Sequence, residues 1–132
     1  MSYAATAALQ AAIFARLQAH PDLAGVSVVD ALPPGIGTGL FVLIGPEEVR
    51  EASDKSGAGA EHRLVISVIS DAAGFLQAKT AAVAVAEALD GVPPVLPIGR
   101  VVSLLFAKAV ARRLDDGAAR RIDLTFRARI EF

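Results

Sequence analysis

Cysteine and tryptophan are absent from the 132-residue chain, and aromatic residues make up only 5% of it. Without cysteine there can be no disulfide, no thiolate metal site and no cysteine nucleophile, and this absence is typical of proteins of a reducing cytoplasm. Net charge is also nearly absent, since 13 Lys and Arg face 14 Asp and Glu, which argues against a strongly basic or strongly acidic protein. No apolar run approaches the roughly 18 residues of a membrane helix, so we expect no membrane partner.

Hydrophobic residues, by contrast, make up 54% of the sequence, which is enough for a core in a chain of this length. We therefore expect residues 1–132 to form a single domain. Two segments predict helices. Residues 2–18 contain neither Gly nor Pro, and residues 72–90 end before a Gly and a Pro-Pro pair. Asp71 is expected to be the N-cap of the second helix.

Strand patterns separate and follow the two predicted helices. They occupy residues 26–30, 40–44, 61–70, 100–113 and 118–132, and a turn-rich connection at 32–39 lies between the first two. Residues 61–70 are apolar on both faces in their second half, which is typical of a central strand. The last two strands are joined by Asp116-Gly117, a tight hairpin signal. The pattern predicts an α+β fold: a small mixed, mainly antiparallel sheet of about four to five strands, two flanking helices and a long C-terminal β-hairpin.

Residues 47–60 are polar and include Gly57 and Gly59, so we expect a mobile loop between two strands. Its acidic residues do not follow the alternating ligand pattern of a calcium loop. One interpretation of the chain uses this loop as a lid. The protein would then be a small cytoplasmic ligand-binding or enzymatic α+β domain.

Residue types that carry catalysis are scarce. The chain has two histidines, His20 and His62, and without cysteine they form no recognisable zinc spacing. Ser67 and Ser70 lack the G-x-S-x-G context of a nucleophile elbow. The glycines of residues 35–39 precede a strand, whereas a dinucleotide-binding fingerprint follows one. We predict no catalytic residue, no metal and no cofactor.

Charge is distributed unevenly along the chain. Residues 1–99 carry five Lys and Arg against ten Asp and Glu, whereas residues 100–132 carry eight against four. Such segregation indicates either contact with nucleic acid or complementary charges between subunits. The scarcity of aromatic residues argues against sequence-specific nucleic-acid recognition.

Several stretches in order resemble a known family. They are residues 44–50 (IGPEEVR), 53–57 (SDKSG), the passage 65–76, and 112–127, which begins RRLDDG. Together they resemble the tail-completion proteins, or tail terminators, of long-tailed phages and of bacterial gene transfer agents. The resemblance implies a structural protein rather than an enzyme.

The resemblance also implies a homo-hexameric ring that caps the tail tube and joins it to the head-side connector or stopper protein. The other expected partners are the major tail tube protein and DNA, which would pass through the lumen without sequence-specific recognition. The protein would assemble in the cytoplasm and then be part of the tail of the phage-like particle.

Contacts between subunits or with the tail tube are expected at the acidic 47–60 segment and at the basic C-terminal hairpin. We predict that the acidic segment of one subunit meets the basic hairpin of the next, which is a heterologous contact. The contact candidates are Glu47, Glu48, Arg50, Glu51, Asp54, Lys55, Arg112, Arg113, Arg120 and Arg121.

Overall fold

The computed structural model describes residues 3–31, 39–114 and 117–132. The predicted connection at 32–39 and the turn before Gly117 therefore lie largely outside the described residues. The helices are α1 (Thr6–Ala19), the short 3-10 helix η1 (Pro21–Leu23) and α2 (Leu76–Leu89). The strands are β1 (Ser27–Val29), β2 (Leu40–Glu51), β3 (Gly59–Ser70), β4 (Arg100–Leu114) and β5 (Ala119–Glu131).

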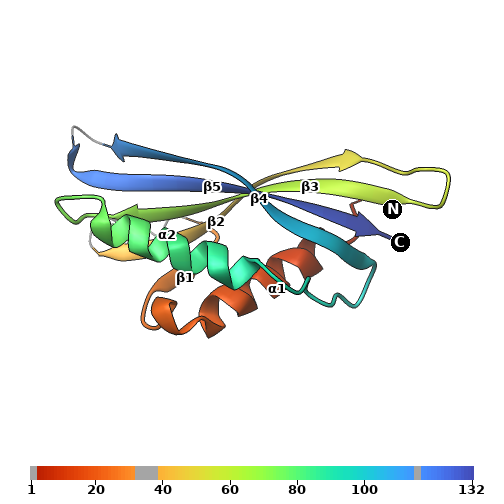
Figure 1. Ribbon diagram of the computed structural model, residues 1–132, viewed down its shortest axis with the longest axis horizontal. Helices are drawn as coiled ribbons and strands as arrows, with labels where there is room; N and C mark the ends of the chain where they lie inside the picture. The colour runs from red at the N-terminus through yellow and green to blue at the C-terminus, as the bar shows by residue number, and fades with distance from the viewer. Residues whose placement is uncertain (1–2, 32–38, 115–116) are drawn as a thin grey trace.

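The strands form one sheet in the order β1-β2-β3-β5-β4. β1 runs parallel to β2, and every other neighbouring pair is antiparallel. The predicted α+β fold with a mixed, mainly antiparallel sheet, two helices and a long C-terminal hairpin is confirmed, as is the central position of β3 (Figure 1). Among these strands, β1 and β4 are the two edges, and they differ greatly in length.

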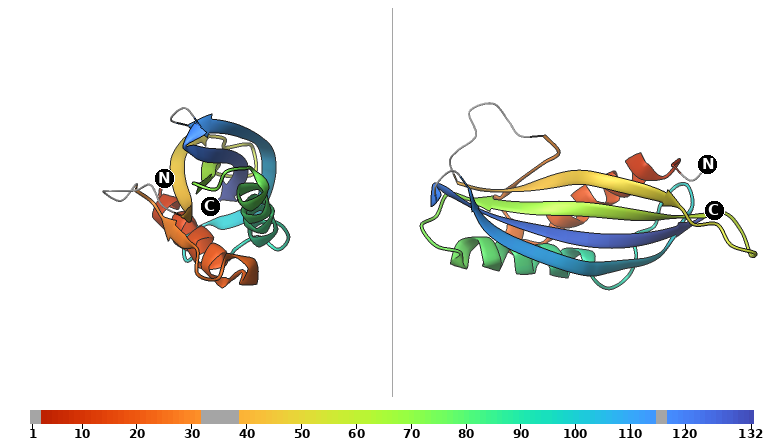
Figure 2. Two further views of the ribbon diagram at one scale, coloured as in Figure 1. Left: turned by 90° about the vertical axis from the view of Figure 1, so that its left-hand side faces the viewer. Right: turned by 90° about the horizontal axis from the view of Figure 1, so that it is seen from above.

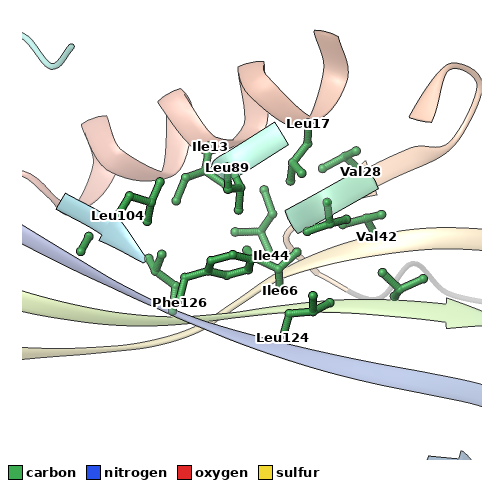
Figure 3. Packing of buried hydrophobic residues seen from close by; sticks show 14 of the residues in the cluster. Ile13, Leu17, Val28, Val42, Ile44, Ile66, Leu89, Leu104, Leu124 and Phe126 are labelled. Carbon is green, nitrogen blue, oxygen red and sulfur yellow. The ribbon is translucent and has the colours of Figure 1, made fainter. Parts of the chain in front are cut away.

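Both helices lie on the same side of the sheet, and the sheet curls over them when viewed along its long axis (Figure 2). The alternation in β5 decides which side chains meet the helices, because successive residues of a strand point to opposite faces. Leu124 and Phe126 are almost fully buried in the core (Figure 3). Arg127, the next residue of β5, is exposed. The ring of Phe126 also meets Phe106 edge to face, with centroids 5.9 Å apart.

The first helix follows its sequence pattern closely. Leu9, Ile13 and Leu17 share one face and are fully buried, and α1 ends directly before His20 and Pro21. In α2 the buried face consists largely of alanine, while Val83 on the opposite side is 59% exposed.

The expected N-cap of the second helix is wrong. α2 begins at Leu76, and the residue that precedes it, Phe75, makes no side-chain cap. The carboxylate of Asp71 instead accepts a hydrogen bond from the backbone N–H of Gly39 at 2.8 Å. Asp71 therefore fixes the entry into β2 next to the exit from β3, and that tertiary contact competes with local capping.

The expectation of a mobile loop over residues 47–60 is also wrong. β2 continues past Gly45-Pro46 to Glu51, and β3 begins at Gly59, so the two strands form a long hairpin with a short turn (Figure 2, right). A register shift between Ile44 and Glu47 accommodates the proline, which cannot donate to the ladder. Proline marks a bulge here and not the end of the strand.

Candidate assembly surfaces

The strand register assigns each paired strand residue to one face of the sheet. On β5 the even-numbered residues from Ile122 to Ile130 are buried on the helix side, and the odd-numbered residues from Arg121 to Glu131 point the other way. We call the helix side the covered face and the opposite side the free face. The two faces differ sharply in charge.

Cations outnumber anions on the free face by two to one among the described residues. The cations are Arg50, Arg63, Arg100, Lys108, Arg112, Arg121, Arg127 and Arg129, and the anions are Glu48, Glu61, Asp123 and Glu131. The rest of the sequence carries five Lys and Arg against ten Asp and Glu. The near-neutral chain is therefore strongly dipolar, with a positive free face.

The acidic contact candidates of β2 do not form one patch. Glu47 lies on the covered face, where its Oε2 is 3.1 Å from Nδ1 of the fully buried His62. Glu48 lies on the free face and accepts a hydrogen bond from Nε of Arg50 at 2.7 Å. This bond lowers the pKa of Glu48 and raises that of Arg50. Glu51 accepts a bond from the backbone N–H of Ser53.

The turn between β2 and β3 is held by its own side chains. The carboxylate of Asp54 accepts hydrogen bonds from the hydroxyl of Ser56 at 2.7 Å and from its N–H at 2.9 Å, which together lower the pKa of Asp54. Arg129 of β5 adds an ion pair to Asp54 at 3.6 Å and donates to the carbonyl of Ala52. Lys55, at the tip of the turn, is exposed.

Arg112 and Arg121 lie directly opposite each other on the free face of the C-terminal hairpin. Asp123 forms an ion pair with both, because its Oδ1 is 2.8 Å from Nε of Arg121 and its Oδ2 is 3.4 Å from Arg112. The hydroxyl of Ser67 also donates to Asp123 at 2.6 Å. Burial raises the pKa of Asp123, but the bonds from Arg121 and Ser67 outweigh it, so the net shift is downward.

Arg113 and Arg120 form a second directly opposed pair, on the covered face. Both guanidinium groups lie 5.6 Å from the ring centroid of Phe75, a cation–π arrangement. Arg120 also donates to the carbonyls of Gly117 and Ala73. It thus ties the start of β5 to the segment before α2, a role within the subunit that the sequence analysis missed.

A third opposed pair, Arg63 and Arg127, was absent from the predicted contact set. These two residues and Lys108 line a hollow of about 460 Å³ in the middle of the free face. The sequence pattern shows that each lies on a strand, but only the register between strands brings them together.

The structure gives no support to the lid interpretation. A hollow of about 620 Å³ lies between α1 and β1, and none of residues 47–60 lines it. Within the described ranges, only His20, Asp22 and Glu87 bring three possible metal-ligand atoms together. Nδ1 of His20 already accepts a hydrogen bond from the backbone N–H of Asp22 at 3.1 Å. No helix among the described residues has the length and apolar character needed to cross a membrane.

The chain matches both a family model and a solved structure. The family model described as tail completion protein gp17 matches residues 11–131. A chain of the solved structure described as "Virion of native gene transfer agent (GTA) particle" is 54% identical, with a TM-score of 0.90, and the match covers 99% of this chain and 100% of that chain. No curated protein matches significantly.

Proposed function

The chain belongs to the tail completion protein gp17 family, and on this premise we propose that it forms a ring that caps the tail tube of a phage-like particle and joins it to the head-side connector. That the protein is a structural tail protein follows from the family itself. The observation that carries the proposal further is the full-length likeness, at 54% identity, to a chain of a gene transfer agent virion.

The partners proposed for this ring are further copies of the chain, the major tail tube protein and the head-side connector or stopper protein. DNA would pass through the lumen without sequence-specific recognition. We propose assembly in the cytoplasm and a final location in the tail of a gene transfer agent or phage-like particle. No enzymatic activity is part of the proposal.

The dipolar surface supports a ring, because a ring subunit presents two different and complementary surfaces to its two neighbours. The free face is positive, and the remainder of the chain is negative. A six-membered ring is the size that the family resemblance implies.

The β2–β3 and β4–β5 hairpins supply the proposed contact residues. Of the ten candidates, seven have exposed side chains and so the accessibility that a contact with a neighbour or the tube needs: Glu48, Arg50, Glu51, Asp54, Lys55, Arg112 and Arg113. Arg120 and Arg121 are half-buried and engaged within the subunit, so we propose that they shape the hairpin rather than contact a partner.

The test is deletion of the gene in a strain that produces the particles, with a plasmid copy of the wild-type gene as control. We expect heads without attached tails and tails of uncontrolled length by negative-stain electron microscopy, both reversed by the plasmid. Cryo-electron microscopy of the complemented particles should place the protein as a ring at the head-side end of the tail tube. Attached tails of normal length in the deletion strain would contradict the proposal.

A further inference from the structure

The hollow in the middle of the free face brings together the cationic side chains of Arg63, Lys108 and Arg127. We propose that it accepts carboxylates of a second copy of the chain, donated by an acidic surface that we define as Asp22, Glu87 and Asp90. The proposal deepens the proposed ring and rests on it. It names the residues through which one copy would recognise the next.

The hollow holds like charges that the subunit does not neutralise. Arg63 and Arg127 are direct cross-strand partners, and like charges so placed repel each other. In the described part of the chain, Lys108 and Arg127 form no ion pair, and Arg63 has only a long one, 3.8 Å from Glu61. An incoming carboxylate would remove this repulsion and accept charge-assisted hydrogen bonds.

In the two other opposed arginine pairs, groups of the same subunit offset the repulsion between the two positive charges. Asp123 bridges Arg112 and Arg121, and the ring of Phe75 and two carbonyls hold Arg120 beside Arg113. In the hollow, Arg63 has the long ion pair to Glu61 and faces Glu48 across β2, but Arg127 and Lys108 have neither kind of support among the described residues. The missing anion is therefore expected from outside the subunit.

The unpaired charge is local rather than a continuous stripe. Toward the ends of the free face, Arg50 pairs with Glu48, Arg100 with Glu131, and Arg129 with Asp54 and Glu131. Among the described residues of the free face, only Lys108 and Arg127, in its middle, form no ion pair. Such a discrete site fits one or a few acidic side chains better than the regular phosphates of a long nucleic acid.

The apolar surroundings of the hollow also favour a protein partner. Leu105 and Val110 of β4 lie on the free face beside it and are 53% and 48% exposed. A surface that mixes apolar side chains with arginine is typical of protein interfaces.

The chain itself offers a complementary surface on its other side. Asp22, Glu87 and Asp90 are exposed at η1 and at the end of α2, two segments that contact each other. Glu87 and Asp90 rim an apolar groove between α2 and β4, in which Val83 and Phe106 are exposed. An acidic rim around apolar side chains matches a basic hollow beside apolar side chains. The contact is heterologous, so repeating it can close a ring.

Cross-linking tests the contact directly, since the cysteine-free chain gives single-site chemistry. We would introduce Ala107→Cys in the hollow and Val83→Cys in the groove together, which leaves the charged groups of the contact in place, and treat both purified protein and isolated particles with a short bis-maleimide. The expected result is a ladder of cross-linked chains. The matched control combines Val83→Cys with Arg50→Cys, because Arg50 lies on the same face as the hollow but is paired with Glu48. The control should give no ladder.

Charge reversal supplies the second arm. Arg127→Glu should weaken association between copies by about tenfold or more, and Glu87→Arg in the neighbouring copy should restore part of the loss. A random-sequence 30-base-pair DNA duplex at low salt is the competing ligand. We expect it to bind wild-type protein and the Arg127→Glu variant equally weakly.

The outcomes separate this inference from the proposed function. A ring at the tail end without any 107/83 ladder overturns the contact and leaves the ring intact. Loss of DNA binding in Arg127→Glu, again without the ladder, assigns the hollow to nucleic acid and overturns the inference. A ladder in purified protein from a chain that is absent from tails supports the contact and rejects the function in the tail.

Discussion

The covered and free faces are built from the same five strands, yet they are stabilised by different means. On the covered face, Ile66, Leu124 and Phe126 are buried under the helices, and removal of their apolar surface from water stabilises the subunit. On the free face, Ser67 and Thr125 are equally buried, although no helix covers them. There the long side chains of Arg121 and its neighbours cover the strand centres while their charged groups reach Asp123.

This difference indicates which face is available for assembly. Where α1 and α2 close the covered face, over residues such as Ile66, Leu124 and Phe126, a change acts on the stability of the subunit. The free face keeps exposed charge in the middle of the sheet, so a change there acts on contacts between molecules. Four substitutions test the division, in order of decreasing effect on stability.

The largest effect is expected on the covered face. Phe126→Ala removes a ring that is only 2% exposed and meets Phe106, and should cost about 3–5 kcal/mol of unfolding free energy. Its sequence neighbour on the free face is the matched control, and Arg127→Ala should change stability by no more than about 0.5 kcal/mol. Urea denaturation measures both. Equal losses would refute the assignment of faces.

Arg120 is the exception, a charged residue that stabilises the covered face. Arg120→Ala removes charge-assisted bonds to the carbonyls of Gly117 and Ala73 and should cost about 1.5–3 kcal/mol. Arg113→Ala is the control, because Arg113 meets the same Phe75 ring but is exposed, and should cost at most about 1 kcal/mol. A similar loss in the two variants would show that only the ring contact matters.

Asp123 provides a pH-dependent test of the free face. Its pKa in the folded protein lies below the ordinary value of 3.8, so its ionised form stabilises the fold at neutral pH. That contribution is lost as the pH falls through the folded pKa. Asp123→Asn should therefore cost about 1–3 kcal/mol at pH 7, and the gap to wild type should close as the pH falls below 3.8. A gap that is constant with pH would assign the loss to packing alone.

The sequence predicted the elements well because their signals are local. Alternation from Ile122 to Glu131 requires only that one face be buried, and the end of α1 at Ala19 requires only Pro21. The two errors arose where a distant contact decides. The carboxylate of Asp71 accepts a hydrogen bond from Gly39, 32 residues away, and therefore does not cap α2. The strand continues past Pro46 because β3 pairs with it.

The hollow on the free face depends on distant contacts even more than the two mispredicted segments do. The charge segregation along the chain was visible, and it directed attention to Arg112, Arg113, Arg120 and Arg121, two of which serve mainly within the subunit. The hollow joins residues of three strands that are up to 64 positions apart. No spacing rule brings such residues together, because the register of β3, β4 and β5 depends on the whole sheet.

The smallest expected effect is also the one that separates stability from assembly most clearly. Arg127→Glu replaces a repulsive cross-strand pair with an attractive one, since the new carboxylate faces Arg63 directly. Cross-strand charge pairs contribute roughly 0.2–1 kcal/mol, so the isolated subunit should become slightly more stable in urea denaturation. Arg63→Gln removes the repulsion together with the long ion pair to Glu61, so it should give a smaller gain in the same direction. If the hollow is instead satisfied within the subunit, both substitutions will destabilise the fold. A more stable subunit that fails to associate can only have lost a contact with another molecule, because its own fold has been strengthened.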